Sequence, residues 1–340
     1  MSKRMLFENG RALIIAEVGS NHAGDPALAL ESIAAAKEAG ADIVKFQMYK
    51  AEQLVDDKMP VLKYIEQSHT TQRERFKSLQ LEEDVFVQLA EATEKAGIHF
   101  MVTPFYEGAI EFLDPFVPAF KIASGDLTNF RLLNSCIKTG KPLILSTGLS
   151  TLAEIDWAVS QVPKEQLHLL HCVGAYPTPD DQVNLKTIPF LSERIGLPVG
   201  YSDHSEGVTA CIAAVAMGAD IIEKHFLPSD NRKVADKALS AGVNQFQLMV
   251  KEIRRVEKMR GSAGKVVQHD ERYFQTTLRR SIYATQDIPV GTPITEEMLV
   301  PLRPWLPDAC SPMHVNDLIG KPVIKQIAAN TPIMRADVEL

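Results

Sequence analysis

The sequence predicts a (β/α)8 barrel of the TIM type followed by a small second domain. Eight short apolar runs of strand character each precede a segment of helical periodicity. The turn after the first run reads GSNHAGD and lacks the GxGxxG pattern of a doubly wound dinucleotide-binding sheet. With 340 residues, the chain is long enough for a barrel of about 250 residues and one further unit.

The predicted strands are apolar runs bounded by turn residues. In chain order they cover 13–18, 42–47, 98–103, 119–124, 142–147, 167–172, 198–203 and 220–225. The helices between and after them are expected at 27–39, 83–96, 106–113, 129–139, 151–161, 184–194, 207–217 and 244–260. Eight such units close into a barrel, so the barrel domain is expected to cover 1–260.

After the eighth helix both periodicities are lost, which predicts a linker over 261–277. The second domain is expected at 278–340. It contains a weak duplication, DIPVGTPITEEML against QIAANTPIMRADV, in which Gly291 and Asn330 precede the shared Thr-Pro-Ile. Both residue types tolerate a positive φ, so each copy is expected to make a tight turn between extended segments.

Composition excludes several classes of protein. A net charge of -7 argues against nucleic-acid binding, and no apolar run is long enough to cross a bilayer. The N-terminus carries no export signal, so a cytoplasmic location is expected. The four cysteines are scattered without CxxC spacing, which indicates reduced thiols and not a zinc knuckle or a disulfide framework.

Polar side chains collect where the predicted strands end, which is where barrels of this type carry their chemistry. Because strand side chains alternate, Lys45 and Gln47 point to the same side. An uncompensated charge inside a barrel is costly, so these groups must pair with one another, with a ligand or with an ion. The polar strand-end residues are Glu17, Asn21, His22, Lys45, Gln47, Thr103, Lys121, Ser124, Asp126, Ser146, Tyr176, Ser202, Asp203, His204, Glu223 and His225.

His204 and His225 end adjacent strands, so their imidazoles can approach one divalent ion. Glu17, Glu223 and Asp236 surround this pair and could complete an open shell. A single strand-end histidine is more often only hydrogen-bonded, and His168 and His171 are interpreted as structural. The pair, however, predicts a metal site.

Two lysines among four hydroxyls suit a small ligand that carries a phosphate and a carboxylate. The lysines are Lys45 and Lys121, and the hydroxyls are those of Thr103, Ser124, Ser146 and Ser202. Taken singly, such hydroxyls are usually caps or turn residues. Lys121 could instead form a Schiff base, as in barrel aldolases, and this alternative remains open.

Ordered motifs run through nearly the whole chain and carry a family resemblance. They read IIAEVGSNHAGD, ADIVKFQ, TPF, FKIASGD, LSTG, HCVGAYPTP, GYSDH and IEKHF. In this order they resemble the N-acetylneuraminate (sialic acid) synthases, a family with legionaminic, pseudaminic and spore-coat polysaccharide members. The tail, with RRSIYATQDIPVGTPITEEML, LRP and DLIGK, is similar to the antifreeze-like SAF domain of these enzymes, which has a β-clip type of fold.

The resemblance implies a synthase dependent on Mn²⁺, or on Mg²⁺ or Co²⁺. Such an enzyme condenses phosphoenolpyruvate with an open-chain N-acylated hexosamine and water to give a nonulosonic acid and phosphate. His204 and His225 match the metal ligands, and Lys121 matches a lysine that binds phosphoenolpyruvate. The residues matching the phosphate site are Lys45, Thr103, Ser124, Ser146 and Ser202. Those matching sugar-side or acid/base positions are Glu17, Gln47, Phe105, Asp126, Tyr176, Glu223 and Asp236. The resemblance also implies a homodimer in which the SAF domain caps the partner's active site through Arg303.

Several sugar-side positions depart from the family pattern. Asp126 replaces a common glutamate, Gly174 replaces a common asparagine or serine, and the segment 55–80 lacks the usual ligand-binding signature. No glycine follows the Arg303-Pro304 pair. The acceptor sugar and its phosphorylation state therefore stay open. Two other classes stay open as well: a Schiff-base pyruvate aldolase, and a degenerate barrel whose tail binds a sugar or a protein surface.

Overall fold

The computed structural model describes residues 10–62, 69–229, 234 and 236–339. The chain divides into two compact units, Met1–Gly261 and Ser262–Leu340.

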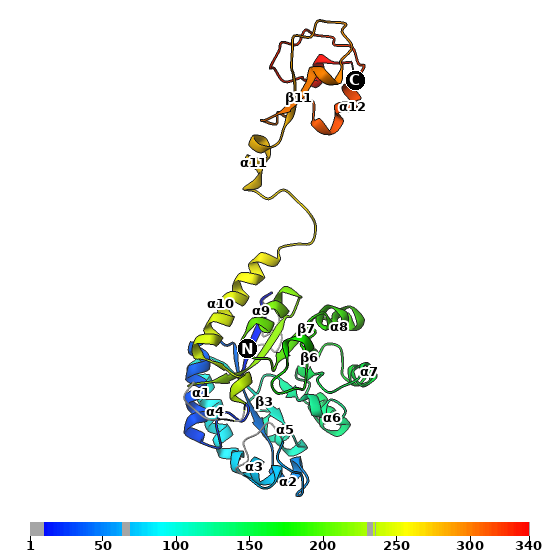
Figure 1. Ribbon diagram of the computed structural model, residues 1–340. Coiled ribbons are helices and arrows are strands. Elements are labelled where there is room, and N and C mark those ends of the chain that lie inside the picture. Colours follow the sequence, from blue (N-terminus) through cyan, green and yellow to red (C-terminus); the bar gives the residue numbers. More distant parts are fainter. Residues whose placement is uncertain (1–9, 63–68, 230–233, 235, 340) are drawn as a thin grey trace. The chain divides into compact units, whose positions relative to one another are not determined.

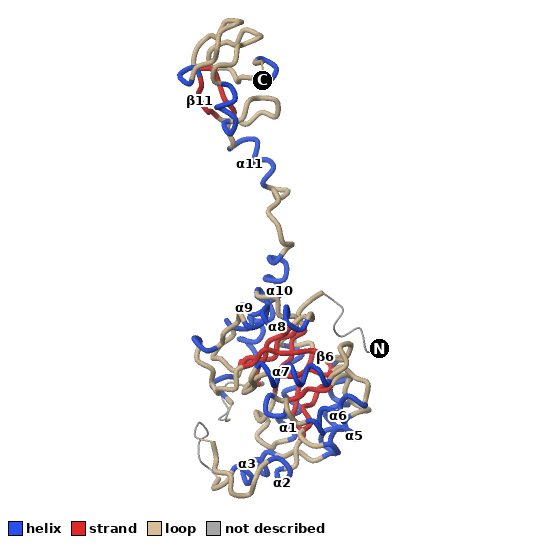
Figure 2. The backbone as a smooth tube through the Cα atoms, turned by 90° about the vertical axis from the view of Figure 1, so that its right-hand side faces the viewer, coloured by secondary structure: helices blue, strands red, loops and turns tan. Residues whose placement is uncertain are grey.

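The first unit is a closed parallel barrel (Figure 1), which confirms the predicted fold class. Neighbouring strands pair in sequence order, and β8 pairs with β1 to close the barrel. Figure 2 shows the strands gathered inside a ring of helices. The strands are β1 (Leu13–Glu17), β2 (Ile43–Met48), β3 (His99–Pro104), β4 (Phe120–Ile122), β5 (Leu143–Ser146), β6 (Leu167–Cys172), β7 (Val199–Asp203) and β8 (Ile221–Leu227). A short strand, β9 (Ala241–Gly242), pairs in parallel with the end of β8.

The helices of the β/α units lie close to their predicted positions because local capping signals fix their ends. Asp25 caps α1, whose first residue is Pro26, and Gly97 ends α4 in the left-handed conformation. Asn184 also has a positive φ, which delays the start of α8 relative to the prediction. The helices are α1 (Pro26–Glu38), α4 (Glu83–Ala96), α5 (Glu107–Leu113), α6 (Phe130–Lys138), α7 (Leu152–Gln161), α8 (Thr187–Ile195), α9 (Thr209–Ala216) and α10 (Val243–Arg260).

Two helices between β2 and β3 were not predicted. They are α2 (Ala51–Leu54) and α3 (Gln72–Leu79). A capping box at Thr71 and Glu74 starts α3. These two helices precede α4, the regular helix of this β/α unit, and α3 brings new side chains to the end of the barrel where the strands finish.

The barrel interior changes from apolar to polar along the strands. One layer of buried inward side chains is apolar and consists of Leu13, Ile15, Ile43, Met101, Ala119, Ile144, Leu170 and Ile221. Two residues further along their strands, Ile15, Ile43 and Ala119 give way to Glu17, Lys45 and Lys121. The strand period of two therefore places the charges above a closed apolar floor.

The second unit has its own small core around an antiparallel pair, β10 (Ser281–Ala284) and β11 (Leu299–Leu302). The helix α12 (Val315–Leu318) lies in the same unit. Gly291 and Asn330 both have positive φ, which confirms the two predicted turns. The duplicated segments meet through a bridge between Ile288 and Ile327.

The expectation that 261–277 lacks regular structure is wrong in one respect. The helix α11 (Glu271–Leu278) occupies its second half. The Glu271 carboxylate accepts a hydrogen bond from the backbone N–H of Gln268, which supports the first turn, and Tyr273 and Phe274 contact each other edge to face. Local contacts thus form a short helix where sequence periodicity is too weak to predict one.

None of the described helices combines the length and the apolar character that a membrane-spanning segment needs.

Candidate active site

A cavity of about 260 Å³ opens where the barrel strands end. The side chains that line it come from β1 to β8, from their following loops and from α3. The predicted site residues along its wall are Glu17, Lys45, Gln47, Thr103, Phe105, Lys121, Ser124, Ser146, Tyr176, Ser202, His204, Glu223, His225 and Asp236.

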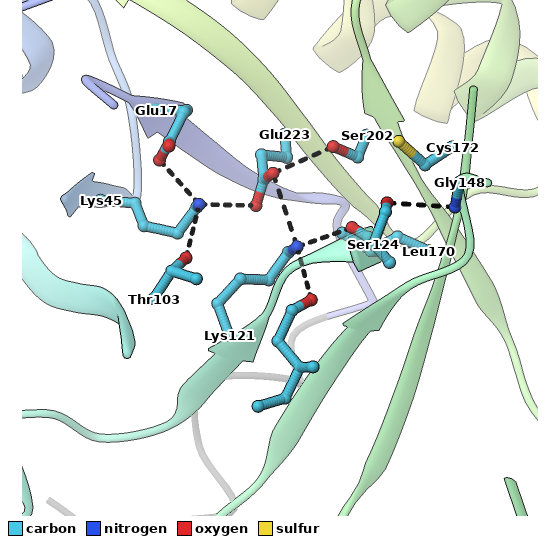
Figure 3. Close-up of polar contacts among 12 residues, drawn as sticks. Glu17, Lys45, Thr103, Lys121, Ser124, Gly148, Leu170, Cys172, Ser202 and Glu223 are labelled. Carbon is cyan, nitrogen blue, oxygen red and sulfur yellow. Dashed lines mark hydrogen bonds and ion pairs between the residues drawn. The ribbon is translucent and has the colours of Figure 1, made fainter. Parts of the chain in front are cut away.

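Two lysines and two glutamates form a buried cluster at the base of this cavity (Figure 3). Lys45 Nζ lies 2.7 Å from Glu17 Oε2 and 3.6 Å from Glu223 Oε2. Lys121 Nζ lies 3.8 Å from Glu223 Oε1. Glu223 is thus shared between both ammonium groups, and all four side chains are almost completely buried.

The charges in this cluster set one another's pKa values. Although burial alone would raise it, Lys121 and Lys45 lower the pKa of Glu223 to about 2. Despite burial, Glu17 and Glu223 raise the pKa of Lys45, so it stays charged. Burial lowers the pKa of Lys121, whose ion-pair partner Glu223 is shared with Lys45. Burial raises the pKa of Glu17 by more than the ion pair with Lys45 lowers it.

Hydroxyl groups surround the charged cluster (Figure 3). Lys45 Nζ donates to Thr103 Oγ1 at 3.1 Å, and Lys121 Nζ donates to Ser146 Oγ at 2.6 Å. Ser202 Oγ donates to Glu223 Oε1 at 2.9 Å. Ser124 Oγ accepts from the Gly148 backbone N–H at 3.1 Å. These donors and cations converge on one small volume, as an oxyanion site requires.

His204 and His225 lie side by side, with ring centroids 5.4 Å apart. The Nδ1 of His204 hydrogen-bonds the Val173 carbonyl at 2.8 Å, which directs its other ring nitrogen elsewhere. The Nδ1 of His225 is buried and has no hydrogen-bond partner among the described residues, and Asp236 Oδ2 lies 3.9 Å from it. Burial lowers the pKa of His225 to about 3, so its ring is neutral at pH 7. Within the part of the chain that the structure describes, no group of three or more His, Cys, Asp or Glu side chains is already arranged as a metal site.

The upper wall of the cavity combines aromatic and amide groups. Tyr176 stacks on His204, with centroids 4.1 Å apart. Gln47 Nε2 donates to Glu17 Oε1 at 2.7 Å. Phe105 lies 6.2 Å from the ring of Tyr49. An aromatic wall beside carboxylate and amide groups is suited to a polyhydroxylated ligand.

A second ion pair lies on the outer side of the same strands. Lys224 Nζ contacts Asp203 Oδ2 at 2.8 Å, and both side chains are fully buried. Asp203 Oδ1 accepts from Tyr201 and from the backbone N–H and hydroxyl of Ser205, while Lys224 also donates to the Ser205 carbonyl. Asp203 and Lys224 directly precede His204 and His225, so this pair joins the two strands at the level of the histidines.

Two predicted residues lie elsewhere. Asp126 is not on the cavity wall, although its neighbours Ser124 and Gly125 are. Its carboxylate accepts from Asn129 at 3.1 Å, and burial raises its pKa. Arg303 is exposed in the second unit.

Other residues of the cavity wall were missed. Cys172 Sγ lies 3.7 Å from His204 Nδ1, a place in the site that the interpretation of the cysteines as reduced thiols does not include. Its position two residues beyond the inward-facing Leu170 could have revealed it. Gln72 and Arg75 come from the unpredicted helix α3, and no strand pattern indicates them.

Family models and known proteins match most of this chain. The NeuB family model matches residues 32–265, and the SAF domain model matches residues 279–339. An uncharacterized protein of Methanocaldococcus jannaschii is 44% identical over 86% of this chain and 84% of its own length. The N,N'-diacetyllegionaminic acid synthase of Legionella pneumophila is 37% identical over 96% of this chain and 94% of its own. The pseudaminic acid synthase of Campylobacter jejuni is 34% identical over 96% of both chains.

A solved structure of a named synthase has a similar fold and sequence. The N-acetylneuraminic acid (sialic acid) synthetase of Leptospira borgpetersenii, crystallised with citrate, superposes with a TM-score of 0.71 at 34% identity. That comparison covers 78% of this chain and 90% of the other.

Proposed function

This chain belongs to the NeuB family, and from this premise we propose that it is a nonulosonate synthase. It condenses phosphoenolpyruvate with an N-acylated hexosamine and water, and it releases phosphate and a nine-carbon sugar acid. Relatives named for legionaminic, pseudaminic and sialic acid products support this reaction class.

The observation that carries the proposal is the shared, incompletely satisfied charge cluster at the barrel mouth. Lys45 and Lys121 face one small volume together with the hydroxyls of Thr103, Ser146 and Ser202. Lys45 and Lys121 bind the phosphate and carboxylate of phosphoenolpyruvate and stabilise the charge that develops on the departing phosphate. Ser124 adds a further hydroxyl to the phosphate-binding side.

A divalent cation fits beside the two histidines. We propose Mn²⁺, with Mg²⁺ or Co²⁺ as alternatives. The ring of His225 is neutral, and its Nδ1 has no hydrogen-bond partner among the described residues. Both features support this fit, since a neutral imidazole is a metal ligand. His204 and His225 would hold the ion, with Asp236 nearby. An ion bound there would supply Lewis-acid polarisation of the acceptor aldehyde.

Carboxylates next to the lysines move protons. Glu17 has a raised pKa and is held by Lys45 and Gln47, so it can exchange a proton with the acceptor oxygen or the attacking water. Glu223, which the two lysines keep ionised, is a further proton acceptor, whereas Asp126 lies off the cavity wall and receives no acid/base role here. Phe105 and Tyr176 orient the sugar from the cavity wall.

The second unit contributes across a homodimer in this proposal. Its match to the SAF domain and the exposed position of Arg303 support a role in which Arg303 of one copy closes the active site of the other. The four cysteines are buried and free, which is consistent with a cytoplasmic location, where thiols stay reduced.

Phosphate release tests the reaction. We expect phosphate only when phosphoenolpyruvate, a divalent cation and a suitable N-acylated hexosamine are all present, and we expect EDTA to abolish it. The acceptor panel contains N-acetylmannosamine, its 6-phosphate, the corresponding uronic acid and a diacetamido-trideoxyhexose. Absence of phosphate release with every sugar would overturn the proposal.

A Schiff-base aldolase is the second candidate, because the lowered pKa of Lys121 suits a nucleophilic amine. Borohydride trapping of pyruvate on Lys121, together with activity that survives EDTA, would favour it. If borohydride traps no adduct and phosphate release depends on the metal, the result favours the synthase.

A further inference from the structure

Helix α3 brings an arginine to the cavity that the reaction described above does not use. Arg75 lines the cavity and is only 8% exposed. Within the described ranges, its guanidinium makes no ion pair and no hydrogen bond; its near neighbour is the aromatic ring of Phe76, 5.5 Å away. A buried cation that lacks a counter-charge is costly, so its presence needs a reason.

The other buried cations of the barrel all have carboxylate partners. Lys45 and Lys121 share Glu17 and Glu223, and Lys224 contacts Asp203. Arg254, which is partly buried, contacts Asp42 and Glu257. Among the described residues that line the cavity, Arg75 is therefore the cation whose charge is uncompensated.

Two polar groups around Arg75 are also unsatisfied. Gln72 is 1% exposed, lies on the cavity wall, and its Oε1 has no hydrogen-bond partner among the described residues. The buried hydroxyl of Tyr49 likewise has none, and its ring contacts Phe76 at 5.1 Å. The positive charge of Arg75 reaches Tyr49 and counteracts the burial that raises the pKa of its phenol. One cation and two unpaired polar groups thus lie together at the α3 side of the cavity.

This group is separate from the elements that hold phosphoenolpyruvate. Lys45 and Lys121 project from β2 and β4 directly above the apolar floor. Arg75 and Gln72 lie on α3, beyond the end of β2, and Tyr49 contacts Phe105 at the end of β3. Phe105 is one of the proposed sugar-side residues, so the α3 group borders the acceptor and not the three-carbon donor.

We propose that Arg75, supported by Gln72, binds an oxyanion carried by the acceptor sugar at the end remote from its aldehyde. This inference rests on the synthase function proposed above and specifies its substrate class: an N-acylated hexosamine that carries a phosphate monoester or a carboxylate. A guanidinium binds either group through two parallel hydrogen bonds, and the Gln72 amide can donate to a further oxygen or accept from a neighbouring hydroxyl.

Acceptor selectivity tests this inference in the full-length, metal-loaded protein. We expect the wild type to use N-acetylmannosamine 6-phosphate or the corresponding uronic acid with a kcat/KM about 100-fold above that for neutral N-acetylmannosamine. Preference between the two anionic sugars identifies the oxyanion. Arg75→Met is expected to lose about 100-fold for the anionic sugar, to change less than about threefold for the neutral one, and to keep the KM for phosphoenolpyruvate.

Two control variants separate binding from general effects. Lys77→Met removes one positive charge from the exposed side of the same helix and is expected to leave the selectivity unchanged. Arg75→Lys keeps the charge but not the planar fork and is expected to retain part of the preference. Circular dichroism and a thermal melt check that each variant is folded.

The outcomes distinguish the inference from the synthase function itself. Equal use of neutral and anionic sugars by the wild type, exclusive use of the neutral diacetamido-trideoxyhexose, or a preference that survives Arg75→Met would each overturn the role of Arg75 and leave the synthase intact. A rise in the KM for phosphoenolpyruvate in Arg75→Met, with unchanged sugar selectivity, would reassign the arginine to the donor and also overturn the inference. Failure of every sugar to release phosphate overturns the synthase function first.

Discussion

The inner and outer sides of strands β7 and β8 carry two buried charge clusters with opposite properties. On the outer side, the carboxylate of Asp203 is saturated by Lys224, Tyr201 and Ser205. On the inner side, Glu223 is shared by two lysines, and its Oε2 has no hydrogen-bond partner in the part of the chain that the structure describes. A saturated cluster stabilises a fold, whereas an unsaturated one is prepared for a ligand.

The largest effect is expected on the outer side. Lys224→Met leaves Asp203 buried without a cation, so we expect the barrel to lose about 3 to 5 kcal/mol of unfolding free energy. Urea denaturation followed by tryptophan fluorescence and circular dichroism measures this loss. Lys138→Met, which removes an exposed lysine from α6, is the matched control and should change stability by less than about 0.5 kcal/mol. A Lys224→Met variant as stable as this control would break the comparison.

On the inner side we expect the reverse pattern. Lys121→Met should lower kcat/KM for phosphoenolpyruvate by about 10² to 10³-fold, because a cation that stabilises the leaving phosphate is gone. Stability should fall by less than about 1 kcal/mol, since Glu223 keeps Lys45 and Ser202 as partners. Steady-state kinetics and urea denaturation measure the two effects. Lys50, which lies at the rim and is half exposed, gives the control Lys50→Met. A stability loss as large as that of Lys224→Met, with activity intact, would contradict the distinction.

A third carboxylate sharpens the comparison because no cation of the described residues forms an ion pair with it. Asp220 precedes β8 at the opposite end of the barrel, and burial raises its pKa to about 6 from an ordinary value of 3.8. Its Oδ1 has no hydrogen-bond partner among the described residues. The carboxyl is therefore protonated in the folded state below pH 6, whereas in the unfolded chain it ionises above pH 3.8.

The sign of the pH effect follows from this raised pKa. The stability that the protonated carboxyl provides is complete below about pH 3.8 and is lost as the pH rises through 6. Asp220→Asn removes this loss, so at pH 8 we expect the variant to be more stable than the wild type by about 2 to 3 kcal/mol. Near pH 4 the two should be alike. Thermal or urea unfolding at both pH values checks this, and an equal difference at both would show that ionisation is not the cause.

The sequence predicted the barrel and most of the cavity wall because both depend on short-range rules. The strand period of two alone places Glu17, Lys45 and Lys121 above the apolar layer. The turns at Gly291 and Asn330 follow from the conformational tolerance of those residue types. NeuB and SAF matches then agree with the resemblance that the ordered motifs gave.

Other parts of the site depend on contacts that no local pattern encodes. The division of Glu223 between two lysines depends on the placement of three strands, β2, β4 and β8, around a closed barrel. Arg75 and Gln72 reach the cavity only because an inserted helix folds over the strand ends. Asp126 is equivalent to its neighbours in the sequence pattern, but it ends the short helical turn Ser124–Asp126 and is not part of the cavity wall.

Direct binding of phosphoenolpyruvate tests the central claim, that the unsaturated inner cluster is the donor site. Calorimetric titration in the presence of Mn²⁺ and without acceptor should give one site per chain in the wild type and in Lys50→Met. Lys45→Met and Lys121→Met should each weaken binding by about 100-fold or more. Wild-type affinity in both of these variants, with their folds intact, would contradict the assignment.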